Sequence, residues 1–341
     1  MSSPAKLFFH NEELNINPFF LFPGQGAQYQ GMAIDFLESQ SFKINREKLT
    51  RLFSVASEIA GKDMVSLLRN SGAEFLKRTD VSQPAITIAN LAAASCLVEN
   101  GIKPAGCAGF SLGEYAALAI TGVITEEDCL ELVTARGKAM QAVVDKMIAD
   151  AGNASPGMAA VTGLDPVRIE SLVTEWKSKD PVFGELFIAN YNSPKQTVVS
   201  GSANALAKAE NLFTEAGARN YIRLEVAGPF HSPFMKPAEE EFRPSLEKVK
   251  FNDPAIPLYS NVTGQRVLTG EEAKKLALKQ ITGAVRWTDT EAAIAGAGGI
   301  DICLETGPGR TLQRFWRDTG SKIICAAAGS ASDISKIIAG L

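Results

Sequence analysis

The chain has 341 residues, of which 45% are hydrophobic and 21% charged, and its formal net charge is −4 at pH 7. Such a chain is long enough to bury one large domain, or one domain that carries a smaller one, and its composition is that of a soluble globular protein. The mildly negative charge argues against a general nucleic-acid binder.

The N-terminal extension, residues 1–17, contains no apolar stretch of signal-peptide length and has acidic residues early. The longest apolar stretch, residues 84–98, is interrupted by Thr87, Asn90 and Ser95, and we expect it to be too short and too polar to span a bilayer. The five cysteines include no C-x-x-C pair, which favours buried, reduced thiols over a metal or redox site. The expected location is therefore the cytoplasm, without membrane contact.

Up to about residue 150 the chain alternates short apolar runs with helical patterns, as α/β proteins do. The first strand runs into a glycine-rich loop, and the first long helix ends at Gly101, a residue typical of helix C-termini. Thr125 is well placed to cap the N-terminus of the next long helix. The elements expected here are strands at 19–22 and 103–110 and helices at 83–100, 112–122 and 124–147.

The pattern changes near residue 155. From 156 to 226 the order strand, helix, strand, strand, helix, strand is that of the ferredoxin-like βαββαβ motif, which we expect as an inserted subdomain. The chain then returns to α/β elements, and a catalytic core is expected from residues 18–155 and 227–341. The strands expected from residue 156 onward are 157–164, 185–192, 196–202, 221–226, 256–262 and 301–307.

Ser111 lies in a G-x-S-x-G pentapeptide between an expected strand and an expected helix. This context is typical of a nucleophile elbow, in which Gly109 and Gly113 remove Cβ atoms where the two elements crowd together. The free N–H groups at the start of the helix can receive negative charge that develops on a substrate oxygen. Small-residue turns between strands and helices are common, so a purely structural turn is the alternative. The context on both sides favours a nucleophile.

A serine nucleophile needs a base, and the chain contains only two histidines, His10 and His231. His10 lies in the irregular N-terminal segment and is expected at the surface. His231 lies in an extended loop that Pro229 and Pro233 stiffen, and it has no rival as the base. No third carboxylate is indicated by spacing, so a backbone carbonyl could orient the imidazole instead.

Arg136 shares one stripe of the helix at 124–147 with apolar residues, so it is expected to face inward. A buried guanidinium stays charged and needs a partner. One interpretation is a structural ion pair, with Glu114 as the mate. The other is that Arg136 grips a free carboxylate of the substrate. The apolar members of the stripe are Cys129, Leu132, Val133, Met140 and Val143.

Four segments, in order, resemble one family: the malonyl-CoA:acyl carrier protein transacylases and the acyltransferase domains of polyketide and fatty-acid synthases. They are FPGQGAQYQGM at 22–32, GFSLGEYAAL at 109–118, TARGKAMQ at 134–141 and PFHSPFM at 229–235. The segments NVTG and ETGPGRTL near the C-terminus fit as well, and the likeness covers about residues 18–326. Each motif alone is modest, but the ordered set is specific.

The resemblance implies an α/β-hydrolase-like core with an inserted ferredoxin-like subdomain, and it implies a role for each matching residue. Ser111 would be the nucleophile and His231 its base, while Arg136 would hold the malonyl carboxylate. The family usually has histidine before the nucleophile, where this chain has Phe110, so a drier pocket is expected there. The remaining implied roles are oxyanion-hole N–H groups at Gln25 and Leu112, a histidine-orienting carbonyl at Gln280, and substrate contacts at Asn192, Phe110 and Phe230.

The implied activity is ping-pong transfer of malonyl from coenzyme A to the phosphopantetheine thiol of an acyl carrier protein, without a metal or other cofactor. A free-standing chain with these motifs favours fatty-acid synthesis over a polyketide pathway, and a monomer is expected. Two alternatives from other classes are an editing acyl hydrolase and a catalytically silent carrier-binding module. Arg136 argues against the hydrolase, and the intact Ser111 and His231 argue against the silent module.

Overall fold

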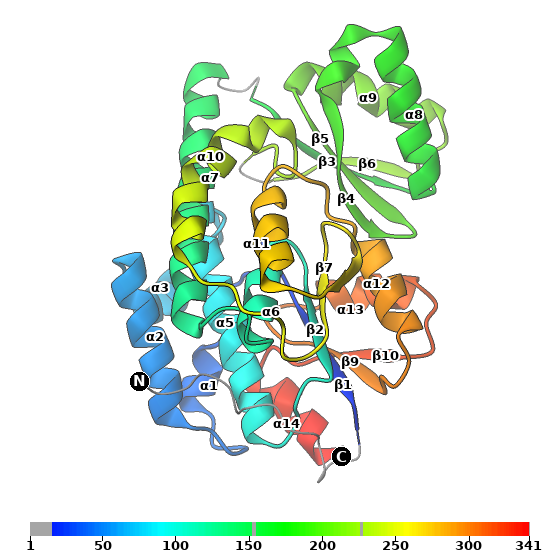
Figure 1. Ribbon diagram of the computed structural model, residues 1–341. Coiled ribbons are helices and arrows are strands. Elements are labelled where there is room, and N and C mark those ends of the chain that lie inside the picture. Colours follow the sequence, from blue (N-terminus) through cyan, green and yellow to red (C-terminus); the bar gives the residue numbers. More distant parts are fainter. Residues whose placement is uncertain (1–15, 152–154, 226–227, 341) are drawn as a thin grey trace.

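A computed structural model describes residues 16–151, 155–225 and 228–340 (Figure 1). His10 and most of the N-terminal extension therefore lie outside the described residues. The described part contains two separate sheets, a larger and largely parallel one and a smaller antiparallel one. This mixed α/β architecture agrees with the α/β class that the sequence predicts.

The larger sheet has six strands, and the N-terminal strand lies in its middle. All pairings are parallel except that between the last two strands of the sheet. The predicted strands at 19–22, 103–110, 256–262 and 301–307 all appear here, the first extended by Pro18 and the other three in shorter form. The order across the sheet is β10 (Ile324–Ala327), β9 (Ile302–Glu305), β1 (Pro18–Phe22), β2 (Gly106–Gly109), β7 (Leu258–Ser260) and β8 (Gln265–Val267).

Helices cover both faces of this sheet (Figure 1). Successive side chains of a strand point to opposite faces, so Phe20 and Phe22 pack with the large N-terminal helices while Phe19 and Leu21 pack with the C-terminal ones. All five residues of β1 are buried, as expected of a parallel strand that is covered on both sides. The covering helices are α5 (Thr79–Glu99), α6 (Gly113–Ile120) and α7 (Glu126–Ala151) on one face and α12 (Trp287–Gly296) and α13 (Thr311–Asp318) on the other.

The helix α5 is longer than predicted and is buried almost all round. It ends as predicted, because Gly101 adopts a φ of 83° and Ile102 donates its N–H to the carbonyl of Leu97. By length and composition alone α5 could cross a membrane, contrary to the expectation that this stretch is too short. However, 94% of its most apolar window is buried inside the protein, so the apolar surface is already covered by the fold.

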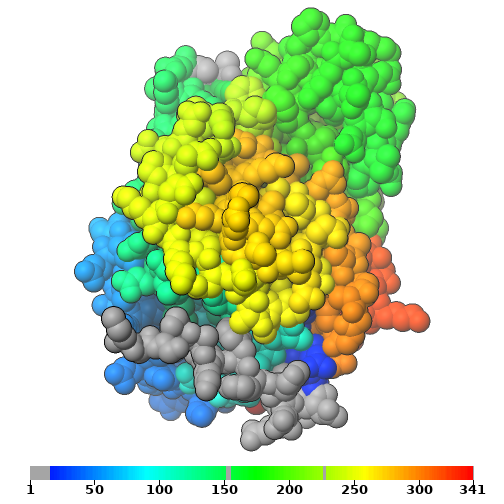
Figure 2. Space-filling model, in the orientation of Figure 1, coloured from blue at the N-terminus to red at the C-terminus, as the bar shows by residue number. Residues whose placement is uncertain are grey.

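The smaller sheet follows the predicted βαββαβ order, and its strands are all antiparallel. It has its own core, in which Trp176 packs edge-on against Phe213. In Figure 2 these residues, in green, form a lobe beside the rest of the molecule. The order across the sheet is β4 (Leu186–Ser193), β5 (Gln196–Gly201), β3 (Gly157–Thr162) and β6 (Asn220–Arg223), with α8 (Pro166–Lys179) and α9 (Ala203–Glu215) as its helices.

The sequence analysis did not predict several short or locally irregular elements. Among them is α10, which begins just after His231 and contains Pro244 in its interior. These elements surround the two sheets and complete the core. They are α1 (Ile34–Glu38), α2 (Arg46–Ala60), α3 (Met64–Asn70), α4 (Ala73–Leu76), η2 (Pro181–Glu185), η3 (Pro233–Met235), α10 (Lys236–Lys248), α11 (Gly270–Lys279) and α14 (Ala331–Ala339), together with helices α12 and α13 and strands β8 and β10.

Candidate active site

Ser111 lies in a sharp turn between the end of β2 and the start of α6. Its φ of 48° is in the left-handed region, which non-glycine residues seldom adopt. A Cβ on Gly109 would lie 2.0 Å from the backbone of Gly113, and a Cβ on Gly113 would lie 2.0 Å from the carbonyl oxygen of Phe22. Only glycine fits at these two positions, so the turn holds Ser111 in one strained conformation.

The Ser111 hydroxyl meets the imidazole of His231, 120 residues further along the chain. The distance from Ser111 Oγ to His231 Nε2 is 2.8 Å, and both side chains are buried. His231 Nδ1 lies 2.9 Å from the carbonyl oxygen of Gln280 and 3.1 Å from that of Gly283. Carbonyl oxygens only accept, so Nδ1 carries the proton and Nε2 is free to accept from the serine.

Burial, together with the nearby positive charge of Arg136, lowers the pKa of His231 to about 4, although the two carbonyl contacts oppose the shift. The imidazole is therefore neutral near pH 7, which is the form that a general base needs. A histidine in water, with a pKa near 6.5, would be partly protonated at that pH.

We expect the reactivity of Ser111 toward a fluorophosphonate probe to be independent of pH from about 8 down to about 5. It should begin to fall below about pH 5 and drop by about tenfold per pH unit below about pH 4, because protonation of His231 removes the base. Labelling rates across this range measure the effect. In Arg136→Ala the acid limb should move to higher pH, because the cation that disfavours imidazolium is gone.

If the labelling rate of the wild type began to fall near pH 6.5, this would contradict the assignment of His231 as a buried histidine that is unprotonated near pH 7. The carboxyl of Glu114 needs a separate check, since burial raises its pKa to about 7. A fall in labelling rate near pH 7 that is absent in Glu114→Gln would reflect protonation of the Glu114 carboxyl and not of His231.

The two N–H groups implied as an oxyanion hole lie on loops that meet at the elbow. Gly24 packs directly on the elbow, since a Cβ there would lie 2.3 Å from the carbonyl oxygen of Phe110 and 3.4 Å from the nitrogen of Leu112. Within the described residues, the backbone N–H groups of Gln25 and Leu112 donate no hydrogen bond. They remain available for a developing oxyanion, where one such donor is worth about 3 kcal/mol.

Arg136 is almost fully buried, with 2% of its surface exposed, and lies midway along α7. Its Nη1 donates to Gln83 Oε1 at 2.9 Å and its Nη2 donates to Gln280 Oε1 at 3.1 Å. The guanidinium also lies over the ring of Tyr115, 5.6 Å from its centroid. Burial lowers the pKa of Arg136, yet its Nε has no hydrogen-bond partner. Both of its side-chain hydrogen-bond partners are neutral amides, while the buried carboxyl of Glu114 opposes the lowering of its pKa through charge alone.

The interpretation of Glu114 as the mate of Arg136 is not supported. The two groups form no ion pair, and among the described residues no other carboxylate pairs with Arg136. Glu114 instead accepts from Ser260 Oγ at 3.0 Å and from the backbone N–H of Asn261 at 3.0 Å. Arg136 is thus left without an ion-pair partner among the described residues.

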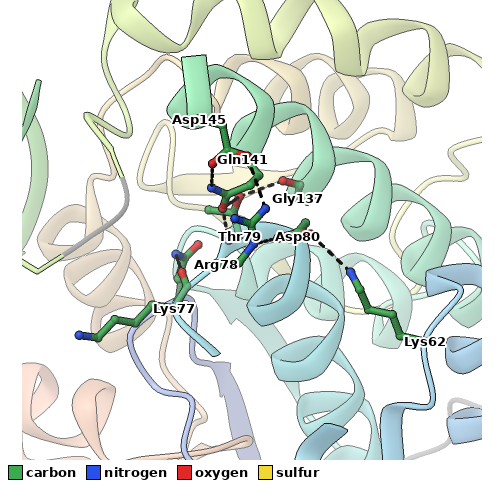
Figure 3. A network of polar contacts seen from close by, with 9 residues as sticks. Lys62, Lys77, Arg78, Thr79, Asp80, Gly137, Gln141 and Asp145 are labelled. Atoms are coloured by element: carbon green, nitrogen blue, oxygen red, sulfur yellow. Dashed lines mark hydrogen bonds and ion pairs between the residues drawn. The ribbon is translucent and has the colours of Figure 1, made fainter. Parts of the chain in front are cut away.

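A polar network connects the start of α5 to α7 (Figure 3). The backbone N–H of Thr79 donates to Gln141 Oε1 at 2.8 Å, and its hydroxyl donates to the Gly137 carbonyl at 2.9 Å. A Cβ on Gly137 would lie 2.6 Å from the Thr79 carbonyl oxygen, so the helices approach closely here. This places Gln83, one turn further along α5, at the guanidinium. The outer network consists of ion pairs among Lys62, Arg78, Asp80 and Asp145.

Sequence reasoning did not identify Gln83. The signal was an amide side chain within a long apolar helix, which also contains Asn90, at a position that is fully buried in the structure. Buried amides need partners, so such a residue marks a polar contact even when no motif names it.

Phe110 packs into an aromatic cluster rather than standing alone beside the serine. Its ring meets Trp287 edge-on, with centroids 5.5 Å apart, and lies 6.0 Å from the ring of Phe315. These contacts belong to the core on the α12 and α13 face of the sheet. A histidine at this position would place a polar ring against two aromatic ones.

We expect Phe110→His to fold but to lose about 1–2 kcal/mol of unfolding free energy, because it gives up two aromatic contacts. Chemical denaturation measures this loss. Phe315→His is the matched control, since it disturbs the same cluster without adjoining Ser111. If Phe110→His changed acyl transfer while Phe315→His, equally destabilised, did not, the ring at 110 would also contact the substrate.

Asn192 and Phe230, the other implied substrate contacts, are both buried. Phe230 directly precedes His231, which itself has a positive φ of 56°. Asn192 lies on β4 and donates to Gln196 Oε1 at 2.8 Å, and its own Oδ1 has no partner. No hydrogen bond joins Asn192 to the serine–histidine pair within the described residues.

A groove of about 360 Å³ reaches His231 from the surface. One wall comes from α8 and β4 of the smaller sheet, and the other comes from residues 282–286 and Pro233. The two walls are tied together, because Val285 exchanges backbone hydrogen bonds of 2.8 Å with Ala189 and Tyr191 of β4. The histidine is thus reached at the boundary between the two sheets. Within the described residues no group of three or more His, Cys, Asp or Glu side chains is arranged to hold a metal.

A buried serine–histidine pair on a strand–turn–helix elbow is the arrangement found in enzymes that use an activated serine as nucleophile. The family model described as "Acyl transferase domain" matches residues 19–337, and the chain belongs to that family.

Individual relatives and solved structures show which members of the family this chain is similar to. Two similar proteins are named malonyl CoA-acyl carrier protein transacylase. The one from Haemophilus influenzae is 35% identical over 86% of this chain and 88% of its own length. The one from Bacillus subtilis is 33% identical over 94% of this chain and 95% of its own length. The transacylase structure from Coxiella burnetii superposes with a TM-score of 0.84, at 29% identity over 95% of this chain and 98% of that one. A malonyl-transacylase solved in complex with a type II polyketide-synthase acyl-carrier protein superposes with a TM-score of 0.84, at 30% identity over 95% of this chain and 100% of that one.

Proposed function

We propose that the chain transfers a malonyl group from coenzyme A to the phosphopantetheine thiol of an acyl carrier protein through a malonyl ester of Ser111, and so supplies fatty-acid synthesis. The observation that carries this is a base-activated serine beside a buried Arg136 that has no carboxylate partner. Malonyl-CoA offers both the thioester that the serine attacks and the free carboxylate that the arginine lacks. The names of the relatives support the same assignment.

In the first half-reaction His231 Nε2 takes the hydroxyl proton as Ser111 Oγ attacks the thioester carbonyl. The oxyanion faces the N–H groups of Gln25 and Leu112. Collapse breaks the carbon–sulfur bond, and the coenzyme A thiol leaves with the proton from His231. In the second half the carrier thiol gives its proton to His231 and attacks the ester, and Ser111 recovers its proton as it leaves.

The alternatives differ in the acceptor. An editing hydrolase would pass the acyl group to water and would have little use for Arg136. A polyketide-pathway acyltransferase would use the same chemistry with another carrier. The solved complex with a type II polyketide carrier favours this alternative. So does a polyketide biosynthesis protein of Burkholderia thailandensis, which is 33% identical over 94% of this chain but only 25% of its own length.

The wider assignments belong to the same proposal. The larger sheet with its helices would be an α/β-hydrolase-like catalytic core of residues 18–155 and 227–341, and residues 156–226 would be a ferredoxin-like subdomain. The enzyme would act as a cytoplasmic monomer, without membrane contact, nucleic acid, metal or other cofactor. Cysteine chemistry would not contribute, since all five thiols are buried and free.

Intact-mass analysis tests the proposal. Malonyl-CoA alone should add one malonyl group to the protein, and a pantetheinylated carrier protein added next should take it up. Loss of the adduct to water before the carrier is added would favour the hydrolase, and absence of any adduct would favour the silent module. Comparison of fatty-acid and polyketide carriers as acceptors separates the two pathways.

A further inference from the structure

Glu114 is a buried carboxylate that the mechanism above does not use. It lies in the first turn of α6, three residues after Ser111, and only 3% of its surface is exposed. Its Oε1 accepts from Ser260 Oγ, and its Oε2 accepts from both the backbone N–H and the side-chain Nδ2 of Asn261. A carboxylate is costly to bury, so three donors aimed at it indicate a fixed structural junction.

Asn261 is the centre of this junction. It directly follows β7, which is the parallel neighbour of β2, so the carboxyl ends of both strands meet beside the elbow. Besides contacting Glu114, Asn261 Nδ2 donates to the Gly109 carbonyl at 2.9 Å. Asn261 thus holds both sides of the strained turn, the last residue of the strand and the first turn of the helix.

The same asparagine also holds the segment that orients the base. Its carbonyl accepts the N–H of Arg286 at 2.6 Å. Gly283 lies three residues before Arg286, and its carbonyl accepts from His231 Nδ1. The carbonyl of Gln280 accepts from the same nitrogen. Hydrogen bonds and short stretches of backbone therefore close a ring from the serine through the histidine and back to the elbow.

We propose that Glu114 is a positioning residue for acyl transfer, which acts through Asn261 to hold the nucleophile elbow and the histidine-orienting segment in one rigid frame. This inference rests on the proposed function, because it assigns the frame to the Ser111–His231 pair. The frame sets the Oγ–Nε2 distance without touching the substrate. An error of about 1 Å in such an arrangement can cost about 10²-fold in rate.

The test uses Glu114→Gln, which keeps the volume of the side chain but replaces one acceptor oxygen by a donor. We expect the rate of Ser111 labelling by a fluorophosphonate to fall by about 10- to 100-fold. The kcat for malonyl and for acetyl transfer should fall by the same factor, while the KM for malonyl-CoA changes by less than about twofold. Equal losses for both acyl groups separate this effect from one on Arg136.

The matched control is Glu305→Gln. Glu305 is equally buried and accepts the N–H groups of Leu312 at 3.0 Å and Gln313 at 2.8 Å, but it lies outside the ring. Its variant should lose stability and keep the wild-type labelling rate.

Each outcome is decisive. A folded Glu114→Gln enzyme that labels at the wild-type rate overturns the inference, and so does a rise in KM with kcat unchanged. If Glu114→Gln does not fold, Ser260→Ala is used instead, because it removes one of the three hydrogen bonds to Glu114. A Ser260→Ala enzyme that labels at the wild-type rate then overturns the inference. Failure of the proposed function looks different, since the wild type itself would then form no malonyl adduct.

Discussion

Replacement of Ser111 by alanine should abolish the malonyl adduct while the protein stays folded. The hydroxyl is the group that the ester bond needs, and it is the one hydroxyl that contacts His231 Nε2 within the described residues. Transfer to the carrier should fall by about 10⁴-fold or more, as it does when a serine nucleophile is removed elsewhere. Intact mass after incubation with malonyl-CoA and the rate of carrier malonylation measure the two effects.

The companion variant His231→Ala should also slow acylation by orders of magnitude, because no other described side chain accepts from Ser111 Oγ. His10→Ala is the control, and we expect it to retain the wild-type rate. A malonyl adduct of normal yield in Ser111→Ala would contradict the assignment of the nucleophile. Equal behaviour of the two histidine variants would contradict the assignment of the base.

The sequence was sufficient where local pattern and fold agree. The elements on both sides of Ser111 and the βαββαβ order were predictable because the strands are short apolar runs and several helices, though not α6, begin at capping residues. Thr125 illustrates this, since its hydroxyl accepts the N–H of Asp128 at 3.0 Å, as the N-cap prediction requires.

The sequence was insufficient where the deciding contact is distant in the chain. The helix α5 begins at Thr79 and not at residue 83, because Gln141 of another helix accepts the Thr79 N–H. The strands β8 and β10 lie at the two edges of the larger sheet and are too short for their pattern to be recognised. The partners of Glu114 were also missed, since spacing along the chain cannot show that Ser260 and Asn261 adjoin it.

The preference for malonyl over acetyl should depend on Arg136. Arg136→Ala should lower malonyl transfer by about 10²-fold, which corresponds to about 3 kcal/mol, the scale of a buried, charge-assisted pair. Acetyl transfer should stay equal or rise, because the acetyl group has no carboxylate for the guanidinium to bind. The kcat/KM values for the two acyl-CoA substrates, measured side by side, give the ratio that matters.

Arg136→Lys is the informative companion to the alanine variant. Arginine can grip a carboxylate with two N–H groups while its others reach Gln83 and Gln280, whereas lysine offers a point charge without this fork. Lysine should therefore restore malonyl transfer only in part. The side chain of Gln280 contacts Arg136 and its carbonyl orients His231, so a structural role would disturb the base and slow both substrates alike. Equal losses of malonyl and acetyl transfer in the alanine variant would assign Arg136 to the scaffold, and selectivity would then have to arise elsewhere in the pocket.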